Sequence, residues 1–233
     1  MKSNYQSYGK VVERLGQYRE ELGVSQAEMG SYFDVTQPHY QKLEKGMKVI
    51  SQKSLLAFEA AGFDVFWLLT GKKNDSGFLD SYVNKFDSAR QQQKFLEALI
   101  WATEEGTRIN GDEYDGSLYK AYELMKVSEL DERFIWKRIR RTEDLTQIEM
   151  ANLLEINIKR YRKIEKGEIA EDAAILASLY ENLHYSPMLI LNRKKYCLDE
   201  LNRIWSKFDA SLLQRLLRYM EIISDILSYE KED

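Results

Sequence analysis

Apolar residues recur at helical spacing along most of the chain, and this period is the main signal for its secondary structure. The segments FLEALIWA (95–102) and LLQRLLRYMEIISDIL (212–227) show it, and so does the segment that ends at Gly23. In that first segment the apolar face is formed by Val11, Val12, Leu15, Tyr18 and Leu22. Because only two prolines and few glycines interrupt the pattern, we predict an all-α fold.

The chain also contains an internal repeat. Residues 23–46 (GVSQAEMGSYFDVTQPHYQKLEKG) align without gaps with residues 144–167 (DLTQIEMANLLEINIKRYRKIEKG). Eight aligned positions hold identical residues. They are Gln26, Glu28, Met29, Tyr40, Lys42, Glu44, Lys45 and Gly46 in the first segment, which match, in the same order, Gln147, Glu149, Met150, Tyr161, Lys163, Glu165, Lys166 and Gly167 in the second. Apolar positions also match between 55–71 and 176–192, so we predict two copies of about sixty residues each.

Within each copy the sequence predicts two short helices joined by a turn. A capping box, in which a hydroxyl and a carboxylate three residues later bind each other's backbone N–H groups, marks the first of them. The pairs are Ser25 with Glu28 and Thr146 with Glu149. The next helix has Thr36 or Asn157 as its N-cap and ends at Gly46 or Gly167. Pro38 lies in its first turn, where proline is tolerated. With one helix before and two after, each copy is a five-helix helix-turn-helix bundle.

The duplicated region extends past each copy. A KFD sequence occurs at 85–87 and again at 207–209, in both cases before a further helical segment. Residues 105–117 are rich in Gly, Asp and Asn and lack an apolar period, which predicts a linker. We therefore expect a first domain at 1–106 with its core at 10–72, a linker at 107–117, and a second domain at 118–233 with its core at 131–193.

Composition narrows the classes of protein. A chain of 233 residues is long enough for two compact domains, and its formal net charge is -4. The single cysteine, Cys197, excludes an intrachain disulfide, and His39 and His184 form no metal-binding pattern, so we expect neither metal nor cofactor. Because no apolar run reaches the roughly 18 residues of a membrane span and residues 1–10 lack an apolar secretion core, we expect a cytoplasmic protein.

The repeated motif resembles the lambda-repressor-like family of helix-turn-helix proteins, also called XRE or Cro/C1 type. Its pattern is an arginine in helix 1, then [S/T]-Q-x-E-hydrophobic-small, and a third helix that ends hydrophobic-E-[K/R]-G. The chain has Arg19, SQAEMG and LEKG in the first copy, and Arg140, TQIEMA and IEKG in the second. LLTG (68–71) also resembles a common end of this domain, whereas LILN (189–192) departs from it.

The resemblance implies both structural and DNA-binding roles. The arginine of helix 1 is expected to form a bidentate pair with the glutamate near the end of helix 3. The pairs are Arg19 with Glu44 and Arg140 with Glu165. Helix 3 enters the major groove with its N-terminal residues at base edges, while the start of helix 2 contacts phosphate. Gln26 and Gln147 are therefore expected to bind phosphate, the alternative being an ordinary polar residue at a helix start.

In the first copy the positions that the family turns towards DNA hold Thr36, Gln37, Pro38, His39 and Lys42, with Lys45 at the helix end. A glutamine amide can bind N6 and N7 of adenine together, so Gln37 is the best candidate for direct readout. His39 either contacts DNA or is an exposed polar residue. Tyr40 and its counterpart Tyr161 occupy an inward position, so we expect them to pack in the core rather than stack on bases.

In the second copy the same positions hold Asn157, Ile158, Lys159, Arg160 and Lys163, with Arg162 and Lys166 nearby. The net charge of this helix is roughly +4. A guanidinium could bind guanine, an ammonium would hold phosphate, and Ile158 could contact a thymine methyl group. A basic face that only contacts solvent is the alternative.

These features predict a sequence-specific double-stranded DNA-binding transcriptional regulator, expected to be a repressor. Since the two recognition helices differ, its operator should be asymmetric or pseudo-palindromic. The alternative is a protein-interaction module such as an antitoxin, antirepressor or adaptor. An enzyme is not expected, because the sequence lacks a nucleophile with a partnered histidine and a glycine-rich phosphate loop. The apolar run at 212–227 could be buried within the chain or against a second chain, and we favour a homodimer.

Overall fold

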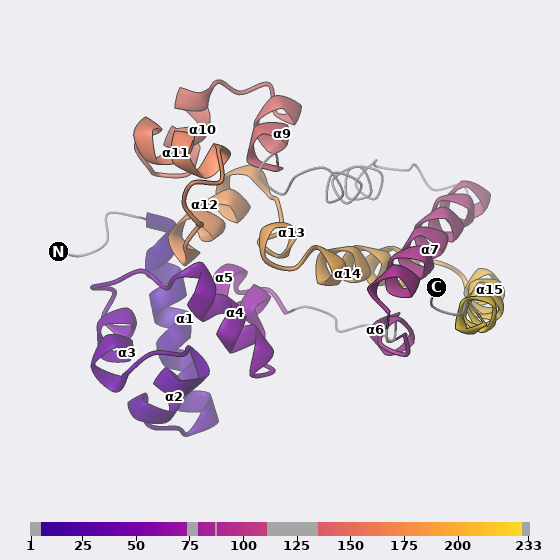
Figure 1. Cartoon of the computed structure of the whole chain (residues 1–233), viewed down its shortest axis with the longest axis horizontal. Coiled ribbons are helices and arrows are strands. Elements are labelled where there is room, and N and C mark those ends of the chain that lie inside the picture. Colours follow the sequence, from indigo (N-terminus) through magenta and orange to yellow (C-terminus); the bar gives the residue numbers. More distant parts are fainter. Residues whose placement is uncertain (1–5, 74–78, 87, 111–134, 230–233) are drawn as a thin grey trace. The chain divides into compact units, whose positions relative to one another are not determined.

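The computed structural model describes residues 6–73, 79–86, 88–110 and 135–229. These residues form fourteen helices and no strand apart from one isolated bridge, which confirms the predicted all-α class. Contacts divide the chain into two compact units, whose helices are labelled in Figure 1. Unit 1 contains the described parts of residues 1–74 and 127–191, and unit 2 contains those of residues 75–126 and 192–233.

The first copy of the repeat forms five helices of unit 1 around one core. They are α1 (Gln6–Leu22), α2 (Gln26–Tyr32), α3 (Gln37–Glu44), α4 (Gln52–Ala60) and α5 (Val65–Thr70). Stacked rings fill part of this core, with Phe33 and Phe58 at 4.1 Å and Phe58 and Phe63 at 4.6 Å between ring centroids. The predicted apolar face of α1 packs into the core except for Leu22, which is 40% exposed.

The second copy repeats this order in unit 1. Its helices are α9 (Ile135–Thr142), α10 (Gln147–Leu153), α11 (Ile158–Glu165), α12 (Ala173–Leu183) and α13 (Met188–Leu191). The first residues of α10, α11 and α12 align with those of α2, α3 and α4, as the repeat predicts. The two copies differ at their ends. Helix α5 is capped by Gly71 with a φ of 74°, whereas α13, in the LILN copy, has only 4 residues.

The four predicted N-cap residues all lie at helix starts, and three of them cap with their side chains, whereas Thr36 makes no side-chain capping bond. Ser25 Oγ accepts from the N–H of Glu28 at 3.2 Å, and the Glu28 carboxylate accepts from the N–H of Ser25 at 2.8 Å. Thr146 and Glu149 form the same box with the same distances. Asn157 caps α11 through its side chain, which accepts from the N–H of Arg160 at 2.9 Å, so α10 and α11 each begin at a residue whose side chain caps the helix.

Positive backbone φ angles end these helices where the sequence places glycine. Gly46 has a φ of 66° and Gly167 one of 67°, a conformation that a side chain disfavours. After the first helix of each copy, Gly23 has a φ of 65° in the first copy, while Asp144 adopts 52° at the aligned position of the second. Aspartate tolerates this region better than most residues, so the duplicated backbone is kept despite the substitution.

Helix α12 of the second copy contributes to the hydrophobic core of the first copy, which the sequence did not predict. Helix α12 of the second copy packs against α1 and α5 of the first. Its residues Ala173, Ala174, Leu176 and Ala177 are almost completely buried together with core residues of the first copy. Three alanines keep this face of α12 small, so the neighbouring helices can approach closely. Unit 1 is therefore one packed body that contains both copies.

Backbone and polar contacts reinforce the same junction. Ser51 and Asp172, which occupy aligned positions in the two copies, form an antiparallel bridge, and the N–H of Ala173 donates to the carbonyl of Ile50 at 2.9 Å. At the start of α1, the N–H of Gln6 donates to the Glu155 carboxylate at 2.8 Å. We call the pairing of Ser51 with Asp172 and the residues beside it the joint.

Unit 2 is built from the segments that follow each copy. They form α6 (Leu79–Val83), α7 (Ala89–Asn110), α14 (Arg193–Trp205) and α15 (Ala210–Ser228), which share one core. Inside this core the indole N–H of Trp205 donates to Thr103 Oγ1 at 2.6 Å. Phe86 and Phe208 of the two KFD sequences are both buried, and Asp209 caps α15, while Asp87 lies outside the described residues.

The broad apolar face of the last helix is largely covered within unit 2. Of the nine leucine, isoleucine and methionine residues at 212–227, all but Ile222 and Ile226 belong to the core of unit 2 or pack against it. Ile226 is 57% exposed and Ile222 is 58% exposed. Burial within the chain therefore accounts for most of this run. Cys197, in α14, is completely buried and free, as expected for a small apolar core residue.

The compact units do not follow the linear division at 1–106, 107–117 and 118–233, because each unit takes helices from both halves of the chain. Residues 107–110 of the predicted linker are helical and end α7, and residues 111–117 lie outside the described residues. The linear division follows the internal repeat along the sequence. In the fold, the two copies pack together in unit 1, and the segments that follow them pack together in unit 2. Among the described helices, none has the length and apolar character that crossing a membrane requires.

We predict that Ala177→Leu destabilises unit 1, because its side chain is buried where α12 meets the first copy. Overpacking such a site typically costs about 1–3 kcal/mol. Urea unfolding should show the loss, and amide exchange should accelerate in α1 as well as in α12. Ala60→Leu, at an exposed position of α4, is the matched control. Equal unfolding midpoints for the two variants would show that α12 does not pack tightly against the first copy.

Candidate nucleic-acid interface

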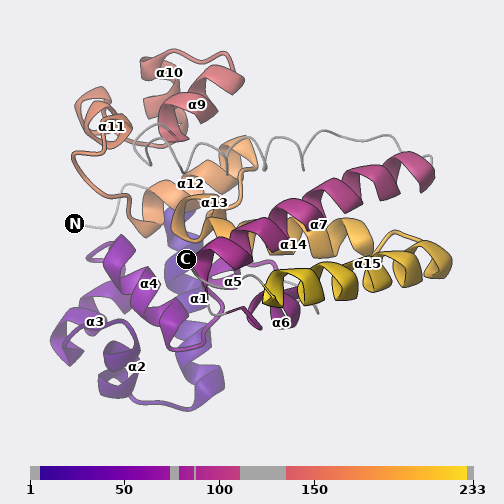
Figure 2. The ribbon, with the colours of Figure 1, turned by 45° about the vertical axis from the view of Figure 1, so that its right-hand side comes forward.

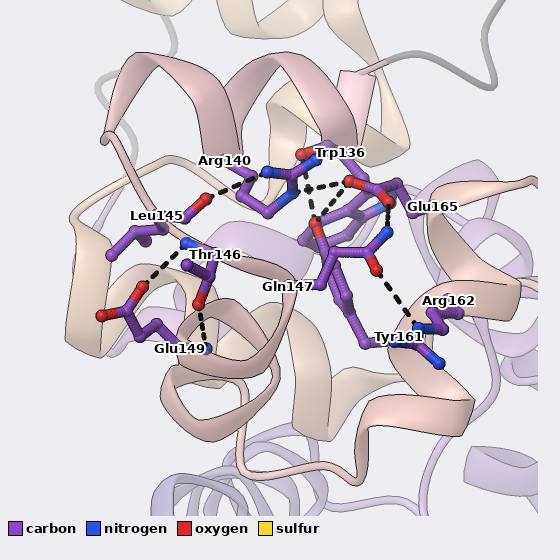
Figure 3. Close-up of polar contacts among 9 residues, drawn as sticks. All are labelled: Trp136, Arg140, Leu145, Thr146, Gln147, Glu149, Tyr161, Arg162 and Glu165. Atoms are coloured by element: carbon purple, nitrogen blue, oxygen red, sulfur yellow. Dashed lines mark hydrogen bonds and ion pairs between the residues drawn. The ribbon is translucent and has the colours of Figure 1, made fainter.

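In the second copy a polar network joins the first three helices (Figure 3). Nε of Arg140, on α9, donates to Oε1 of Glu165 at 2.7 Å, and its Nη1 donates to the carbonyl of Leu145 at 3.0 Å. The amide nitrogen of Gln147, at the start of α10, donates to the other carboxylate oxygen of Glu165. The amide oxygen of Gln147 accepts from Nε of Arg162 at 3.1 Å. One carboxylate therefore fixes α11 to both preceding helices.

The first copy forms the same network. Nε of Arg19 donates to Oε1 of Glu44 at 2.6 Å, and its Nη1 donates to the carbonyl of Val24 at 3.2 Å. The amide nitrogen of Gln26 donates to Oε2 of Glu44 at 2.6 Å. In both copies, therefore, an arginine, a glutamate and a glutamine at aligned positions hold the third helix against the first two.

The pairs predicted from the resemblance are present, but their geometry is not the predicted bidentate one. In both copies only Nε of the arginine contacts the carboxylate, and the glutamine occupies the second oxygen. The hydrogen bond to Glu165 raises the pKa of Arg140. Burial opposes ionisation of Glu165, but the bonds from Arg140 and Gln147 outweigh it and lower the pKa of this carboxyl group. The network is therefore charged and structural.

Tyr40 and Tyr161 lie inside the bundle, as predicted. Both are completely buried, and burial raises the pKa of each phenol above its ordinary value. The Tyr161 hydroxyl donates to Oε1 of Glu165 at 3.3 Å. Neither ring has an exposed face on which a base could stack, so both residues pack in the core, where Tyr161 also contacts the network.

Helix α3 turns a polar first turn to the solvent. Thr36, Gln37, Pro38, Lys42 and Lys45 are exposed, whereas His39 is half-buried. Burial, with Lys48 and Lys42 nearby, lowers the pKa of His39, so this side chain is neutral near pH 7. The exposed set carries one long amide, Gln37, at the first position of the helix and two ammonium groups farther along.

Helix α11 turns a basic surface to the solvent. Its exposed residues among the predicted contacts are Asn157, Lys159, Lys163 and Lys166, and Ile158 is half-buried. Lys166 has a long ion pair with Glu168 at 3.7 Å. Arg160 is partly buried and donates to the Asp172 carboxylate at 2.5 Å, whereas Arg162 is exposed and its Nε donates to the neutral amide of Gln147. The exposed charge of α11 is thus carried by Arg162 together with the lysines.

Asp172 was not among the residues singled out from the sequence. Its position before the apolar segment AAILA predicts an N-cap, and it does cap α12 by accepting from the N–H of Ile175 at 3.2 Å. Its contact with Arg160 joins residues of two different helices across a loop. No sequence periodicity predicts such a pair, because the course of the loop decides it.

Helices α3 and α11 both belong to unit 1. In Figures 1 and 2, α3 lies in the lower part of that unit and α11 in its upper part. The described residues contain no group of three or more His, Cys, Asp or Glu side chains that could hold a metal ion. The candidate interface therefore consists of two separate helical surfaces with polar and cationic side chains.

We predict that Glu165→Gln lowers the free energy of unfolding by about 2 kcal/mol, because it leaves a partly buried guanidinium without its carboxylate. The pKa of Glu165 lies below its ordinary value of 4.5 in the folded state. Its contribution is therefore complete above that pH and is lost as the pH falls through the folded value. Urea unfolding between pH 7 and 3 should show a flatter acid limb for the variant.

Glu168→Gln is the control for this experiment, since Glu168 is exposed and forms only a long ion pair. It should change the free energy of unfolding by less than about 0.5 kcal/mol. An acid limb that is equally steep in Glu165→Gln and in the unchanged chain would contradict a stabilising role for the ionised carboxylate.

Comparison with known proteins agrees with this geometry over part of the chain. A helix-turn-helix family model, of XRE type, matches residues 15–61, which run from the second half of α1 to the end of α4. The match does not extend to the second copy. No curated protein and no solved structure matches the chain. Residues 15–61 thus form a helix-turn-helix domain of a kind found in DNA-binding regulators.

Proposed function

We propose that the protein is a sequence-specific regulator that binds double-stranded DNA with α3 and α11 and acts as a repressor. One observation carries this proposal. In both copies the same Arg–Glu–Gln network holds the recognition helix by its inner side, while its first turn is exposed and polar or basic. A rigid helix with an exposed N-terminal turn is suited to the major groove. Repression is proposed because most proteins that share this motif repress.

The two helices are suited to different contacts. On α3 the exposed Gln37 can donate from its amide nitrogen to N7 of adenine and accept from the N6 amino group with its amide oxygen, and Lys42 and Lys45 can bind phosphate. On α11 the exposed Lys159 and Lys163 supply point charges, which hold phosphates more readily than they select bases. We therefore propose that the first copy supplies more of the sequence preference and the second more of the affinity.

The glutamines at the start of α2 and α10 can serve both protein and DNA. An amide nitrogen carries two hydrogens, so Gln26 and Gln147 can each donate one to the carboxylate of their network and one to a phosphate. Both side chains are half-buried rather than enclosed. We propose that they set the depth of each recognition helix in the groove by linking the backbone of DNA to the network.

The joint supports an operator with two inverted and unlike halves. An antiparallel bridge between aligned residues, Ser51 and Asp172, is the local relation that a two-fold axis produces, although α12 packs on α1 and α5 without equally extensive packing of α4 on α9 and α13. Domains that follow the relation at the joint would address half-sites that run in opposite directions, as a dimer does on a palindrome. Because α3 and α11 carry different side chains, the halves should differ in sequence. We propose that one chain occupies one operator.

The homodimer favoured from the sequence has less surface than expected, since most of the apolar run at 212–227 packs within unit 2. Ile222 and Ile226 are the exposed part of α15 on which a second chain could pack. The protein-interaction alternative is less well supported, because the outer surfaces of α3 and α11 are polar and cationic rather than apolar.

Selection of bound sequences from random duplex DNA at two salt concentrations tests the function. We expect an enriched motif whose binding weakens steeply with salt. On the selected duplex, Gln37→Ala should lose about 1–3 kcal/mol of preference at one A·T pair, while Lys159→Ala should weaken binding to all sequences and reduce the salt slope by about 0.9. Competition binding with base-substituted duplexes measures both effects.

Gln17→Ala and Lys207→Ala, which alter exposed residues of α1 and of unit 2, are the matched controls and should bind as the unchanged chain does. No enriched motif at low salt would exclude sequence-specific DNA binding and favour the interaction module. A loss from only one of the two helix substitutions would show that a single copy contacts DNA.

The relative orientation of the half-sites is a separate prediction. A duplex with inverted halves should bind at least about 10²-fold more tightly than one with either half scrambled, because the second contact is intramolecular. A titration monitored by sedimentation should give one chain per duplex. Equal affinity for direct and inverted halves would contradict the two-fold relation. Two chains per duplex, reduced to one by Ile226→Glu, would establish the homodimer instead.

A further inference from the structure

We propose that Arg160 is a positioning residue that Asp172 holds away from DNA, and that this pair ties the recognition helix of the second copy to the joint. The inference rests on the proposed DNA-binding function and assigns different roles to neighbouring cations of α11. It departs from the expectation from sequence that Arg160, at the third position of the helix, contacts base edges.

The pair is short and partly buried. Nη2 of Arg160 lies 2.5 Å from Oδ2 of Asp172, and the two side chains are 26% and 17% exposed. The other oxygen of Asp172, Oδ1, accepts from the N–H of Ile175 in the first turn of α12. The carboxylate is thus fixed by its capping bond and cannot follow the guanidinium outwards. A charge-assisted bond shielded from water in this way is among the stronger polar contacts.

Asp172 also connects α11 to the rest of unit 1. It is the residue that pairs with Ser51 across the joint, and the following residue, Ala173, donates to the carbonyl of Ile50. The N–H of Ile50 donates in turn to the hydroxyl of Tyr8 at 3.0 Å, on α1 of the first copy. Through its ion pair with Asp172, Arg160 therefore connects the recognition helix of the second copy to the joint between the two copies.

The first copy has no such pair. Its aligned residues are His39 and Ser51, of which Ser51 still caps the next helix by accepting from the N–H of Ser54 at 3.1 Å. The capping function is thus common to both copies, whereas the ion pair occurs only in the second. The charge of Asp172 is not needed for the cap, because serine performs it. We infer that the charge is there for Arg160.

Moving Arg160 onto DNA is unfavourable while Asp172 is ionised. The carboxylate would lose its cation in a partly buried site and would remain close to the phosphates, which carry the same sign of charge. Lys159 and Lys163, which are exposed, have no such competitor among the bonds described above. These lysines consequently make the DNA contacts of the second copy, and Arg160 fixes the angle at which they are presented.

The salt dependence of binding distinguishes a positioning role from DNA contact, because each phosphate contact adds about 0.9 to the slope of log K against log salt concentration. The full chain, R160A, D172N and the double variant would be compared on the duplex selected by the unchanged chain. Asparagine is a good N-cap, so D172N removes the charge and keeps the cap. Thermal unfolding of each variant checks that it is folded.

We expect R160A to leave the slope unchanged and the affinity within about threefold. D172N should steepen the slope by about 0.9, because the released guanidinium then contacts phosphate, and the double variant should return to the original slope. A loss of slope in R160A, or no gain in D172N, would overturn the proposal. If D172N does not fold, R160A alone decides. Failure of the unchanged chain to bind any duplex would instead contradict the proposed function.

Discussion

A carboxylate near the end of the third helix of each copy, Glu44 or Glu165, accepts hydrogen bonds from an arginine of the first helix and a glutamine of the second. Three elements that are far apart in sequence meet at this one group. Its partial burial makes the bonds strong, and it also makes an unpaired charge costly. The orientation of the recognition helix, and so the surface that it exposes, depends on this arrangement.

The same constraint explains why so few residues are identical between the copies. The network, the buried tyrosine and the helix caps fix the backbone, while the outer positions of α3 and α11 can vary without disturbing it. One copy presents Gln37 and the other presents Lys159 on equivalent scaffolds. The two copies thus present unlike surfaces on similar backbones.

Packing adds a second level of organisation. In unit 1, alanines of α12 allow the second copy to complete a core that belongs to the first, and in unit 2 the helices following each copy pack together. Each unit therefore combines equivalent segments from the two halves of the chain. An arrangement of this kind resembles a dimer whose two subunits have been joined into one chain.

The sequence by itself determined the helical class, the repeat, the capping boxes at Ser25 and Thr146, and the partners of Arg19 and Arg140, because these depend on local spacing or on a motif. The starts of α2, α3, α10 and α11 followed for the same reason, whereas the end of α7 at Asn110 did not. The inward tyrosines were also predictable, since their positions on the helices are fixed by the period.

Only the tertiary structure decided how the copies meet and which cations stay exposed. Three contacts join segments that are far apart in the sequence: the burial of Ala177 in the core of the first copy, the bridge between Ser51 and Asp172, and the ion pair of Arg160 with Asp172. The packing of whole helices brings these segments together. The local sequence does not predict such contacts, because many loop conformations are compatible with the same helix caps and apolar periods. The formal charge of α11 was visible in the sequence, whereas the part of it that faces solvent was not.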